Sequence, residues 1–425
     1  MTAPAALWPA AKPAGEARFG LVDALAWCFS VLMVLIYTQP WVMFAPTTDS
    51  MADASNSGPL RVMYFAIYAG GLFVLCLRPW AVVRGLLAQP FLIVLLLVAG
   101  ASMVWSAAPD QTLRRVVAIT LTTLSGVALG ARWRWSTLTE ILATGFAIIA
   151  ILSLFLGALA PSIGRMTELF PGAWRGVFAE KNGFGGLMAF AFLLFAGAAL
   201  LKPRRALLWW PMAGLALALL LLSTSKTSLV SLLLGVSALG FVLLVRRGGA
   251  IAVVAVYLAV IALVGLGAGV ILAPDALLAI LGKDATFTGR TKIWAAILRL
   301  IHERPWLGYG YGAVWTDASG WGPLAKIVKQ AGFTPQHAHN SWLEQWLGMG
   351  LIGLWAWILT YLTTLARTVS AIFRHPGALV AFPFLVVYTL MSLTESIAFT
   401  FNDMRWVMFV ALSVQLARPR GEEPV

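Results

Sequence analysis

The sequence predicts an all-α integral membrane protein with about twelve transmembrane helices, a prediction that rests on composition, apolar runs and one polar interval. Hydrophobic residues occupy 60% of the 425 positions and charged residues only 11%, whereas a soluble domain carries about 25% charged residues. Apolar runs close to the roughly 20 residues that cross a bilayer recur along the chain. The only long polar interval, which ends at Glu344, separates the ninth run from the tenth.

Twelve windows of apolar sequence are long enough, or nearly long enough, to cross a bilayer. Their boundaries are defined to within a few residues, and the shorter windows are expected to borrow flanking residues. In chain order they are 21–44, 60–77, 90–105, 112–131, 138–160, 183–201, 206–222, 228–245, 250–272, 342–365, 378–396 and 406–416. The N-terminal tail lacks a small-residue cleavage site, so we expect the first window to remain as an uncleaved helix.

Basic residues are distributed unevenly between the two sides of the predicted bundle. Those on one side, with the two termini, are Lys12, Arg18, Arg78, Arg84, Arg132, Arg134, Lys202, Arg204, Arg205, Arg246, Arg247, Arg367, Arg374, Arg418 and Arg420. The positive-inside rule places this side and both termini in the cytoplasm, so the long loop faces outward. Basic residues within the loop do not contradict this orientation, because long loops translocate largely regardless of charge.

The net charge of +13 does not indicate a nucleic-acid partner. The excess is divided between the cytoplasmic anchors and the outward loop, and no nucleic-acid-binding motif is visible in the sequence. Cys28 and Cys76 fall inside expected spans, where they are predicted to be apolar core residues rather than a disulfide or a metal site.

The long loop contains a predicted amphipathic helix over residues 290–303. Its apolar residues recur at helical spacing, while its charged residues lie largely on the opposite face. Glycine alternates with Tyr309 and Tyr311 in the segment that follows. Aromatic rings stack well on sugar faces, so this segment is predicted to form an aromatic rim; anchoring at the membrane interface is the alternative.

A candidate general base lies at the end of the loop. His339 precedes a predicted helix start, where Ser341 and Glu344 have the spacing of a capping box. The positive end of that helix disfavours the imidazolium form, and a neutral imidazole can accept a proton. The alternative is that His339 only caps the helix or forms a local hydrogen bond and has no catalytic role. His339 and His337, which is expected on a freer turn, also form a His-x-His pair, for which zinc binding is an alternative. No cysteine or clear third ligand accompanies the pair, so no metal is expected.

Three further basic positions on the outward side need an explanation, because charge near the hydrocarbon is costly unless it is paired or functional. Neighbours on a helix point about 100° apart, so one of Arg114 and Arg115 is predicted to face the bundle interior. Lys226 is held near the membrane plane by a short loop, where snorkelling is an equal alternative. Glu395 should have a basic partner if it faces inward, either Arg405 or an arginine of the long loop.

A further group of polar residues lies at the entrance of a glycine-rich span. It comprises Arg175, Glu180, Lys181 and Asn182. Glu180 and Lys181 could form an interfacial pair of little energetic consequence. Glycine-rich turns also expose backbone N–H groups to anions, so the segment is a moderate candidate for phosphate binding.

These segments together resemble the O-antigen polymerase/ligase superfamily, which includes Wzy-type polymerases, ExoQ-like exopolysaccharide polymerases and WaaL-type O-antigen ligases. The resemblance covers nearly the whole chain, but only the motifs of the long loop are specific. Those motifs are Gly289-Arg290 with Trp294, the run Arg304-Pro305-Trp306-Leu307-Gly308-Tyr309-Gly310, and His339-Asn340 followed by Gly350 and Gly353. Trp105-Ser106 with Pro109, and Lys181-Asn182-Gly183, resemble other recurring segments.

The resemblance implies a GT-C-like glycosyltransferase of the bacterial inner membrane, with its active site facing the periplasm. Its donor would be an undecaprenyl pyrophosphate-linked glycan, and its acceptor a second glycan or lipid A–core. His339 would be the catalytic base and Arg290 a ligand of the pyrophosphate. Lys226 and Arg114 would offset charge on the leaving group, with no metal and no cofactor. The ligases usually carry arginine at the position of Lys226, so this departure favours the polymerase branch.

The resemblance also implies an organisation into three parts. They are an N-terminal bundle of about nine helices over 1–272, a periplasmic catalytic loop over 273–340, and about three C-terminal helices with a cytoplasmic tail over 341–425. The remaining residues expected to contact lipid pyrophosphate or glycan are Arg115, Arg175, Lys181, Asn182, Arg304, Tyr309, Tyr311, Asn340 and Glu395. Other expected partners are membrane lipid and proteins of an export or assembly complex. A transporter of lipid-linked glycans, or a scaffold, remains an alternative.

Overall fold

The computed structural model describes residues 20–40, 58–167, 170–272, 290–316 and 319–418. Within these ranges the chain is helical and contains no named strand; its only bridge joins Arg165 and Trp174. The prediction of an all-α fold is therefore confirmed. Gly289, Lys12, Arg18 and Arg420, which entered the predictions above, lie outside the described residues.

The helices follow one another with short connections. In chain order they are α1 Leu21–Tyr37, α3 Gly58–Cys76, α4 Pro79–Leu87, α5 Pro90–Ala101, η2 Ser102–Trp105, α6 Pro109–Arg132, α7 Trp135–Leu159, α8 Pro161–Gly164, α9 Lys181–Leu201, η3 Pro203–Arg205, α10 Ala206–Leu222, α11 Lys226–Arg246, α12 Gly249–Leu272, α14 Arg290–Glu303, η5 Val314–Thr316, α15 Pro323–Ala331, α16 Ser341–Ile372, α17 Ala378–Thr394 and α18 Met404–Leu416.

Six of the described helices are long and apolar enough to cross a membrane, or seven if one bent pair forms a single span. Five further apolar helices are shorter, and each of the twelve predicted windows coincides with a helix of one of these kinds. The number of membrane crossings is thus not fixed by helix length alone. The window 60–77 does not end at a loop as expected. It continues from α3 into α4 through a 96° bend, because Pro79 starts a new helix directly after Arg78.

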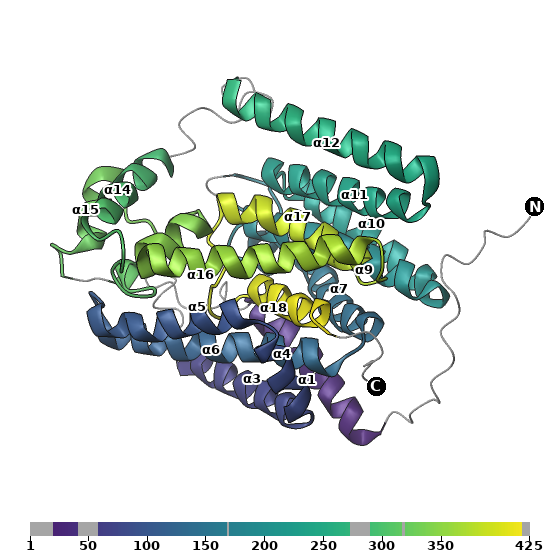
Figure 1. Cartoon of the computed structure of the whole chain (residues 1–425), viewed down its shortest axis with the longest axis horizontal. Helices are drawn as coiled ribbons and strands as arrows, with labels where there is room; N and C mark the ends of the chain where they lie inside the picture. The colour runs from purple at the N-terminus through teal and green to yellow at the C-terminus, as the bar shows by residue number, and fades with distance from the viewer. Residues whose placement is uncertain (1–19, 41–57, 168–169, 273–289, 317–318, 419–425) are drawn as a thin grey trace, which may run out of the picture.

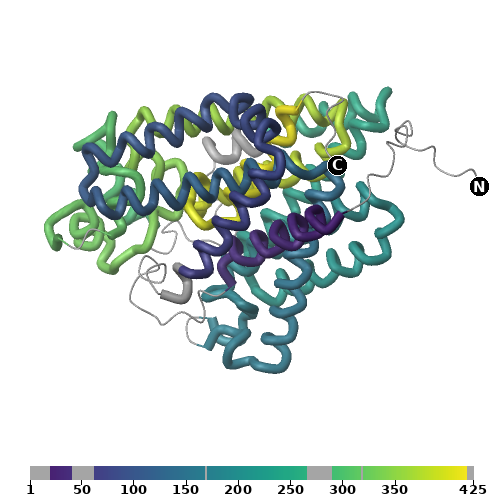
Figure 2. The backbone as a smooth tube through the Cα atoms, turned by 90° about the horizontal axis from the view of Figure 1, so that it is seen from below, coloured from purple at the N-terminus to yellow at the C-terminus, as the bar shows by residue number. Residues whose placement is uncertain are grey.

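The long helix α16 packs against α5 on one side and α17 on the other, and in Figure 1 it lies between a layer that contains α3, α5 and α6 and a layer that contains α11, α12 and α17. Figure 2 gives the same bundle from below. Helix α9 is deeply enclosed, with 83% of its most apolar window buried. A Cβ at Gly186 would lie 3.0 Å from Met391 Cε, so the small residue permits close packing. This contact holds the start of α9 beside the end of α17.

Helices α14 and α15 lie together at one end of the molecule, next to the start of α16 (Figure 1). The apolar face predicted for α14 is confirmed: Ile293, Ile297, Leu300 and Ile301 are buried. They form a second, smaller core with residues of α15 and of the connecting segment, including Ile327. The long loop is therefore a packed unit in its described part.

The connecting segment 305–310 docks onto a break in α16. Gly350 has φ 67° and ψ −169°, which interrupts the helix. The exposed backbone groups pair with the segment: Leu351 N–H donates to Pro305 O at 2.8 Å, and Tyr309 N–H donates to Leu347 O at 3.0 Å. A Cβ at Gly350 would lie 2.1 Å from Trp306 O, so only glycine fits. This lock fixes the loop relative to α16.

Candidate active site

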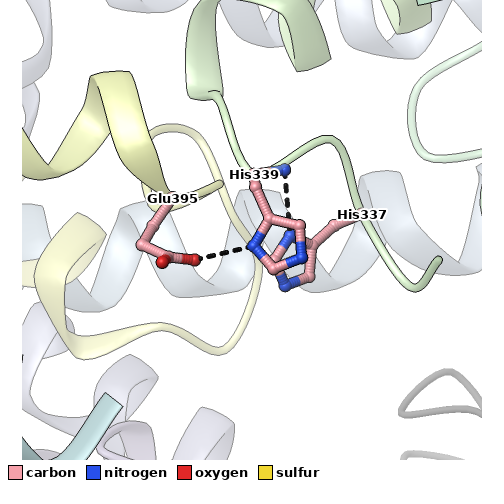
Figure 3. Close-up of side chains that lie close together, drawn as sticks. All are labelled: His337, His339 and Glu395. Atoms are coloured by element: carbon pink, nitrogen blue, oxygen red, sulfur yellow. Dashed lines mark hydrogen bonds and ion pairs between the residues drawn. The ribbon is translucent and has the colours of Figure 1, made fainter. Parts of the chain in front are cut away.

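Arg290, His339 and Glu395 converge at one end of the bundle, although they come from three separate segments. Arg290 Nη2 donates to Glu395 Oε1 at 2.7 Å, and its Nη1 donates to Thr394 O at 2.7 Å. His339 Nδ1 lies 3.1 Å from the second oxygen of the same carboxylate, Glu395 Oε2 (Figure 3). The expectation that Glu395 has a basic partner is confirmed, and the partner is the arginine of the long loop. One carboxylate thus orients both candidate catalytic side chains.

The backbone holds His339 in an unusual conformation. Its φ is 49°, in the left-handed region that few non-glycine residues adopt and in which histidine is enriched. The backbone N–H of His339 donates to His337 Nδ1 at 3.2 Å, and the two rings lie 4.0 Å apart between centroids. The expectation of a freer His337 is therefore wrong, because this hydrogen bond and ring contact fix it. Non-glycine residues held at such angles cluster at functional sites.

The start of α16 supports the site, but not through the predicted capping box. The N-cap is Asn340, whose Oδ1 accepts from Trp342 N at 2.9 Å and Leu343 N at 3.1 Å. Ser341 Oγ instead donates to the backbone oxygen of Glu395 at 2.8 Å. The predicted capping box of Ser341 with Glu344 is wrong, because the N-cap lies one residue earlier, at Asn340. Asparagine is as good an N-cap as serine.

Glu344 forms a hub behind the site. Its Oε2 accepts from Ala338 N at 2.9 Å and from Ser396 Oγ at 3.1 Å, and its Oε1 accepts from Trp315 Nε1. These bonds connect the segment before His339 with the loop that follows Glu395. They fix the spacing between His339 and Glu395, and a fixed spacing is what two side chains that act together in catalysis require.

The surroundings shift the acid–base behaviour of two groups outside the spans. Burial acts to raise the pKa of Glu395, but the hydrogen bond from His339 and the charge of Arg290 outweigh it and lower the pKa to about 2. Burial and, secondly, the neighbouring His339 lower the pKa of His337 to about 3. At neutral pH the site therefore contains an ionised Glu395 and a neutral His337.

The low pKa of Glu395 predicts a pH-dependent contribution to stability. A carboxyl whose folded pKa is depressed stabilises the fold above its ordinary pKa, and the contribution is lost as the pH falls through the folded value. Glu395→Gln is expected to lower the free energy of unfolding at pH 7 by about 1–3 kcal/mol, because Arg290 loses its charged partner. The deficit should shrink between pH 4.5 and pH 2, the ordinary and folded pKa values.

Thermal unfolding in detergent, followed by tryptophan fluorescence across this pH range, measures the deficit. Glu303→Gln is the matched control, since Glu303 pairs with Lys326 on the surface, where removing a pair costs less than about 1 kcal/mol. A deficit for Glu395→Gln that is the same at pH 2 and pH 7 would contradict the ion-pair assignment.

A second group of polar residues lies where α9 and α11 begin. Lys181 Nζ donates to Thr224 Oγ1 at 3.2 Å and lies 3.7 Å from the centre of the Phe170 ring. Ser225 Oγ donates to Asn182 Oδ1 at 3.1 Å. Lys181 and Lys226, each the first residue of its helix, are close enough to interact electrostatically. Two positive side chains thus accompany two helix N-termini, an arrangement that favours anions.

Glu180 connects this group with the first. It interacts electrostatically with Glu395, His339 and Arg290, as expected from the packing of α9 against the end of α17. The alternative in which Glu180 pairs with Lys181 is not found among the described contacts, because Lys181 is directed to Thr224 and Phe170. Glu180 therefore places a carboxyl group near the candidate base.

Comparison with known proteins identifies the family. The family model described as O-Antigen ligase matches residues 211–358. The exopolysaccharide production protein ExoQ of Rhizobium meliloti (strain 1021) is 31% identical over 264 residues, which cover 59% of this chain and 58% of that protein. The O-antigen ligase of Pseudomonas aeruginosa PAO1 is 30% identical over 351 residues, which cover 80% of this chain and 79% of that protein. The chain belongs to the O-antigen ligase/polymerase superfamily.

Membership in this superfamily and the apolar helices make the chain a multi-pass protein of a bacterial inner membrane and a membrane enzyme that processes glycans. The region matched by the O-antigen ligase model includes Lys226, Arg290 and His339, whereas Lys181 and Glu395 lie outside it. The structure brings residues from inside and outside this region together, since Glu395 contacts both Arg290 and His339.

The two tyrosines of the predicted aromatic rim have structural roles. Tyr309 and Tyr311 are 5% and 6% exposed. The Tyr309 hydroxyl donates to Glu303 Oε2 at 3.0 Å, and the Tyr311 hydroxyl donates to Phe399 O at 2.8 Å. Arg304 lies 4.9 Å from the centre of the Tyr309 ring. The predicted aromatic rim for sugar stacking is therefore wrong for these rings, because they are buried in the cores that hold the loop.

The other predicted ligands divide into interior and exterior positions. Arg115 turns inward, where Nη1 donates to Gly312 O, whereas Arg114 is exposed. Arg175 is held by the backbone, with Nε donating to Ile163 O at 2.9 Å. The side-chain oxygen of Asn340 accepts the two backbone hydrogen bonds that cap α16. These contacts give Arg115, Arg175 and Asn340 structural roles that the substrate assignments omitted.

Two supporting residues were missed as such. The capping-box pattern accounts for Glu344 without a role at the site, and the sequence predicts that His337 lies on a freer turn. A hydrogen bond to a distant segment leaves no signal in the local sequence. No local pattern could therefore have indicated the role of Glu344. The His-x-His spacing was the one available signal for His337.

Proposed function

We propose that the protein is a glycosyltransferase that polymerises exopolysaccharide or O-antigen repeat units from undecaprenyl pyrophosphate-linked donors. Transfer occurs at the periplasmic face and is inverting and metal-independent. Residues 1–272 form the N-terminal bundle, 273–340 the periplasmic catalytic loop and 341–425 the C-terminal helices. The single observation that carries the proposal is the shared contact of His339 and Arg290 with one carboxylate, that of Glu395.

This contact supports His339 as the general base. An ionised carboxylate at Nδ1 favours the tautomer with the proton on Nδ1, because only that tautomer can donate to it. Nε2 is then an acceptor and can take the proton of an acceptor hydroxyl. The hydroxyl oxygen bonds to the anomeric carbon as the bond from that carbon to the phosphate oxygen breaks. Glu395 stabilises the imidazolium that results.

Arg290 and the lysines at the start of α9 and α11 suit the leaving group. Arg290 is largely enclosed, with 15% of its side chain exposed, and its guanidinium keeps further N–H donors beyond the two that bind Glu395 and Thr394. Lys226 and Lys181 add charge at helix N-termini. Cations placed where negative charge develops lower the barrier without a metal ion. Arg114, which is exposed, is not part of this proposal.

The polymerase reading is preferred to that of a ligase because of Lys226. Lysine offers a point charge and lacks the bidentate fork of the arginine expected in ligases. The similarities to the ExoQ protein and to the O-antigen ligase are nearly equal, so identity alone does not favour either. In the alternative, the glycan passes from undecaprenyl pyrophosphate to lipid A–core.

Incubation of the purified protein with lipid-linked repeat units alone distinguishes these two activities. We expect a ladder of products that differ by one repeat unit, resolved by gel electrophoresis. A reaction that starts only after lipid A–core is added would identify a ligase instead. The Lys226→Arg variant is the matched comparison, and we expect it to keep its ladder, because the related ligases carry arginine there.

A further inference from the structure

His337, His339 and Glu395 form a compact group of potential metal ligands. Each offers one ligand atom, and the three atoms lie within 4.8 Å of one another (Figure 3). Imidazole nitrogen and carboxylate oxygen are the ligands that zinc takes in many protein sites, and three protein ligands leave one position open. Glu395 supplies the third ligand, which the sequence did not reveal beside the His-x-His pair.

The geometry suits a shared ion. Two ligands bound to one tetrahedral zinc at about 2.0–2.1 Å lie about 3.3–3.4 Å apart. His339 Nδ1 and Glu395 Oε2 are 3.1 Å apart, so both can bind one ion with little movement. The ring of His337 lies beside that of His339, with 4.0 Å between centroids, and its ligand atom lies within 4.8 Å of the other two. The backbone hydrogen bond from His339 to His337 brings the two rings together.

The charge around the group sets the strength of binding. Arg290 occupies Oε1 of Glu395, and its positive charge opposes a cation on Oε2. Glu180 acts in the other direction, since its carboxylate interacts electrostatically with Glu395 and His339. Opposed contributions of this kind indicate a reversible site rather than a permanent structural one.

We propose that His337, His339 and Glu395 bind a divalent zinc-type ion reversibly and that this ion inhibits glycan transfer. The inhibitory effect rests on the proposed function of His339. A metal on Nδ1 displaces the ring proton to Nε2, so the imidazole stays neutral and no proton is released. Nε2 is then a donor and cannot accept the proton of the acceptor hydroxyl. The metal therefore blocks the base that the metal-free reaction uses.

The test uses the full-length protein in nanodiscs with zinc chloride and, as a spectroscopic probe, cobalt(II) chloride. We expect one ion per chain, a cobalt absorption spectrum of low coordination number, and loss of transfer as zinc saturates the site. His337→Ala should weaken cobalt binding and zinc inhibition by at least about tenfold. The matched control is His302→Ala on α14, which should change neither, because His302 is exposed and bonds to Leu298 O.

The two proposals fail in different ways. Cobalt binding that is absent, or that is unchanged in both His337→Ala and His339→Ala, would overturn the metal site and leave the metal-free reaction untouched. Cobalt binding that depends on the two histidines, in a protein whose metal-free transfer does not need His339, would support the site and overturn the catalytic role. Binding at the site without any inhibition would overturn the proposed inhibitory effect.

Discussion

His339→Ala is expected to lower the rate of glycan transfer by about 10²–10⁴-fold, the usual cost of removing a general base. The variant should still fold and bind donor, because the N-cap of α16 is Asn340 and the hub formed by Glu344 does not use the imidazole. Single-turnover transfer from a lipid-linked repeat unit measures the chemical step directly. Donor binding, measured separately, should change little.

His337→Ala is the matched control for this variant. It removes a neighbouring histidine that is equally fixed but makes no contact with Glu395 among the hydrogen bonds of the described residues. We expect it to keep substantial activity, and we expect EDTA to leave transfer by the unmodified protein unchanged. If His337→Ala is the inactive variant, or if EDTA abolishes transfer, a His-x-His metal centre becomes the better explanation.

Arg290→Ala is expected to reduce turnover by about 10²–10³-fold, the cost of removing one charged donor from a developing anion. Arg290→Lys should recover only part of the activity, because lysine restores the charge but not the planar fork that binds Glu395 and a phosphate oxygen together. The rate of transfer at saturating donor is the measurement, and the KM for donor reports ground-state binding.

Arg299→Ala is the control on the same helix, since Arg299 lies on the exposed face of α14. Its rate should match that of the unmodified protein. Full activity in Arg290→Ala would refute a role in pyrophosphate binding. Arg290 also pairs with Glu395, so the Glu395→Gln variant separates the two effects: it should retain donor affinity while Arg290→Ala loses it.

Local patterns predicted the elements well. The amphipathic helix was expected over residues 290–303, and α14 spans Arg290–Glu303, because its apolar residues recur at the helical period and no proline interrupts them. The bend between α3 and α4 was missed, since one hydrophobic window cannot indicate a change of direction. The role of Gly350 inside α16 was also hidden, because this glycine packs against Trp306, which lies more than forty residues away in the sequence.

The site could be predicted only in part, for the same physical reason. Sequence indicated that Glu395 needs a cation, but the choice of Arg290 depends on how two segments 105 residues apart pack. The sequence predicts a sugar-binding rim at Tyr309 and Tyr311, because aromatic residues in a polar loop are expected to be exposed. The Tyr309 hydroxyl instead donates to the carboxylate of Glu303, and the Tyr311 hydroxyl donates to the backbone oxygen of Phe399, which only the packed loop reveals.

Release of undecaprenyl pyrophosphate during transfer tests the central claim most directly. The purified protein is supplied with a lipid-linked repeat unit carrying an isotopic label in its terminal phosphate, and the labelled lipid product is followed together with the lengthened glycan. We predict equal amounts of the two products from the unmodified protein and almost none from His339→Ala. Movement of intact donor across the membrane without cleavage, unaffected by His339→Ala, would contradict the proposed transferase and favour a transporter.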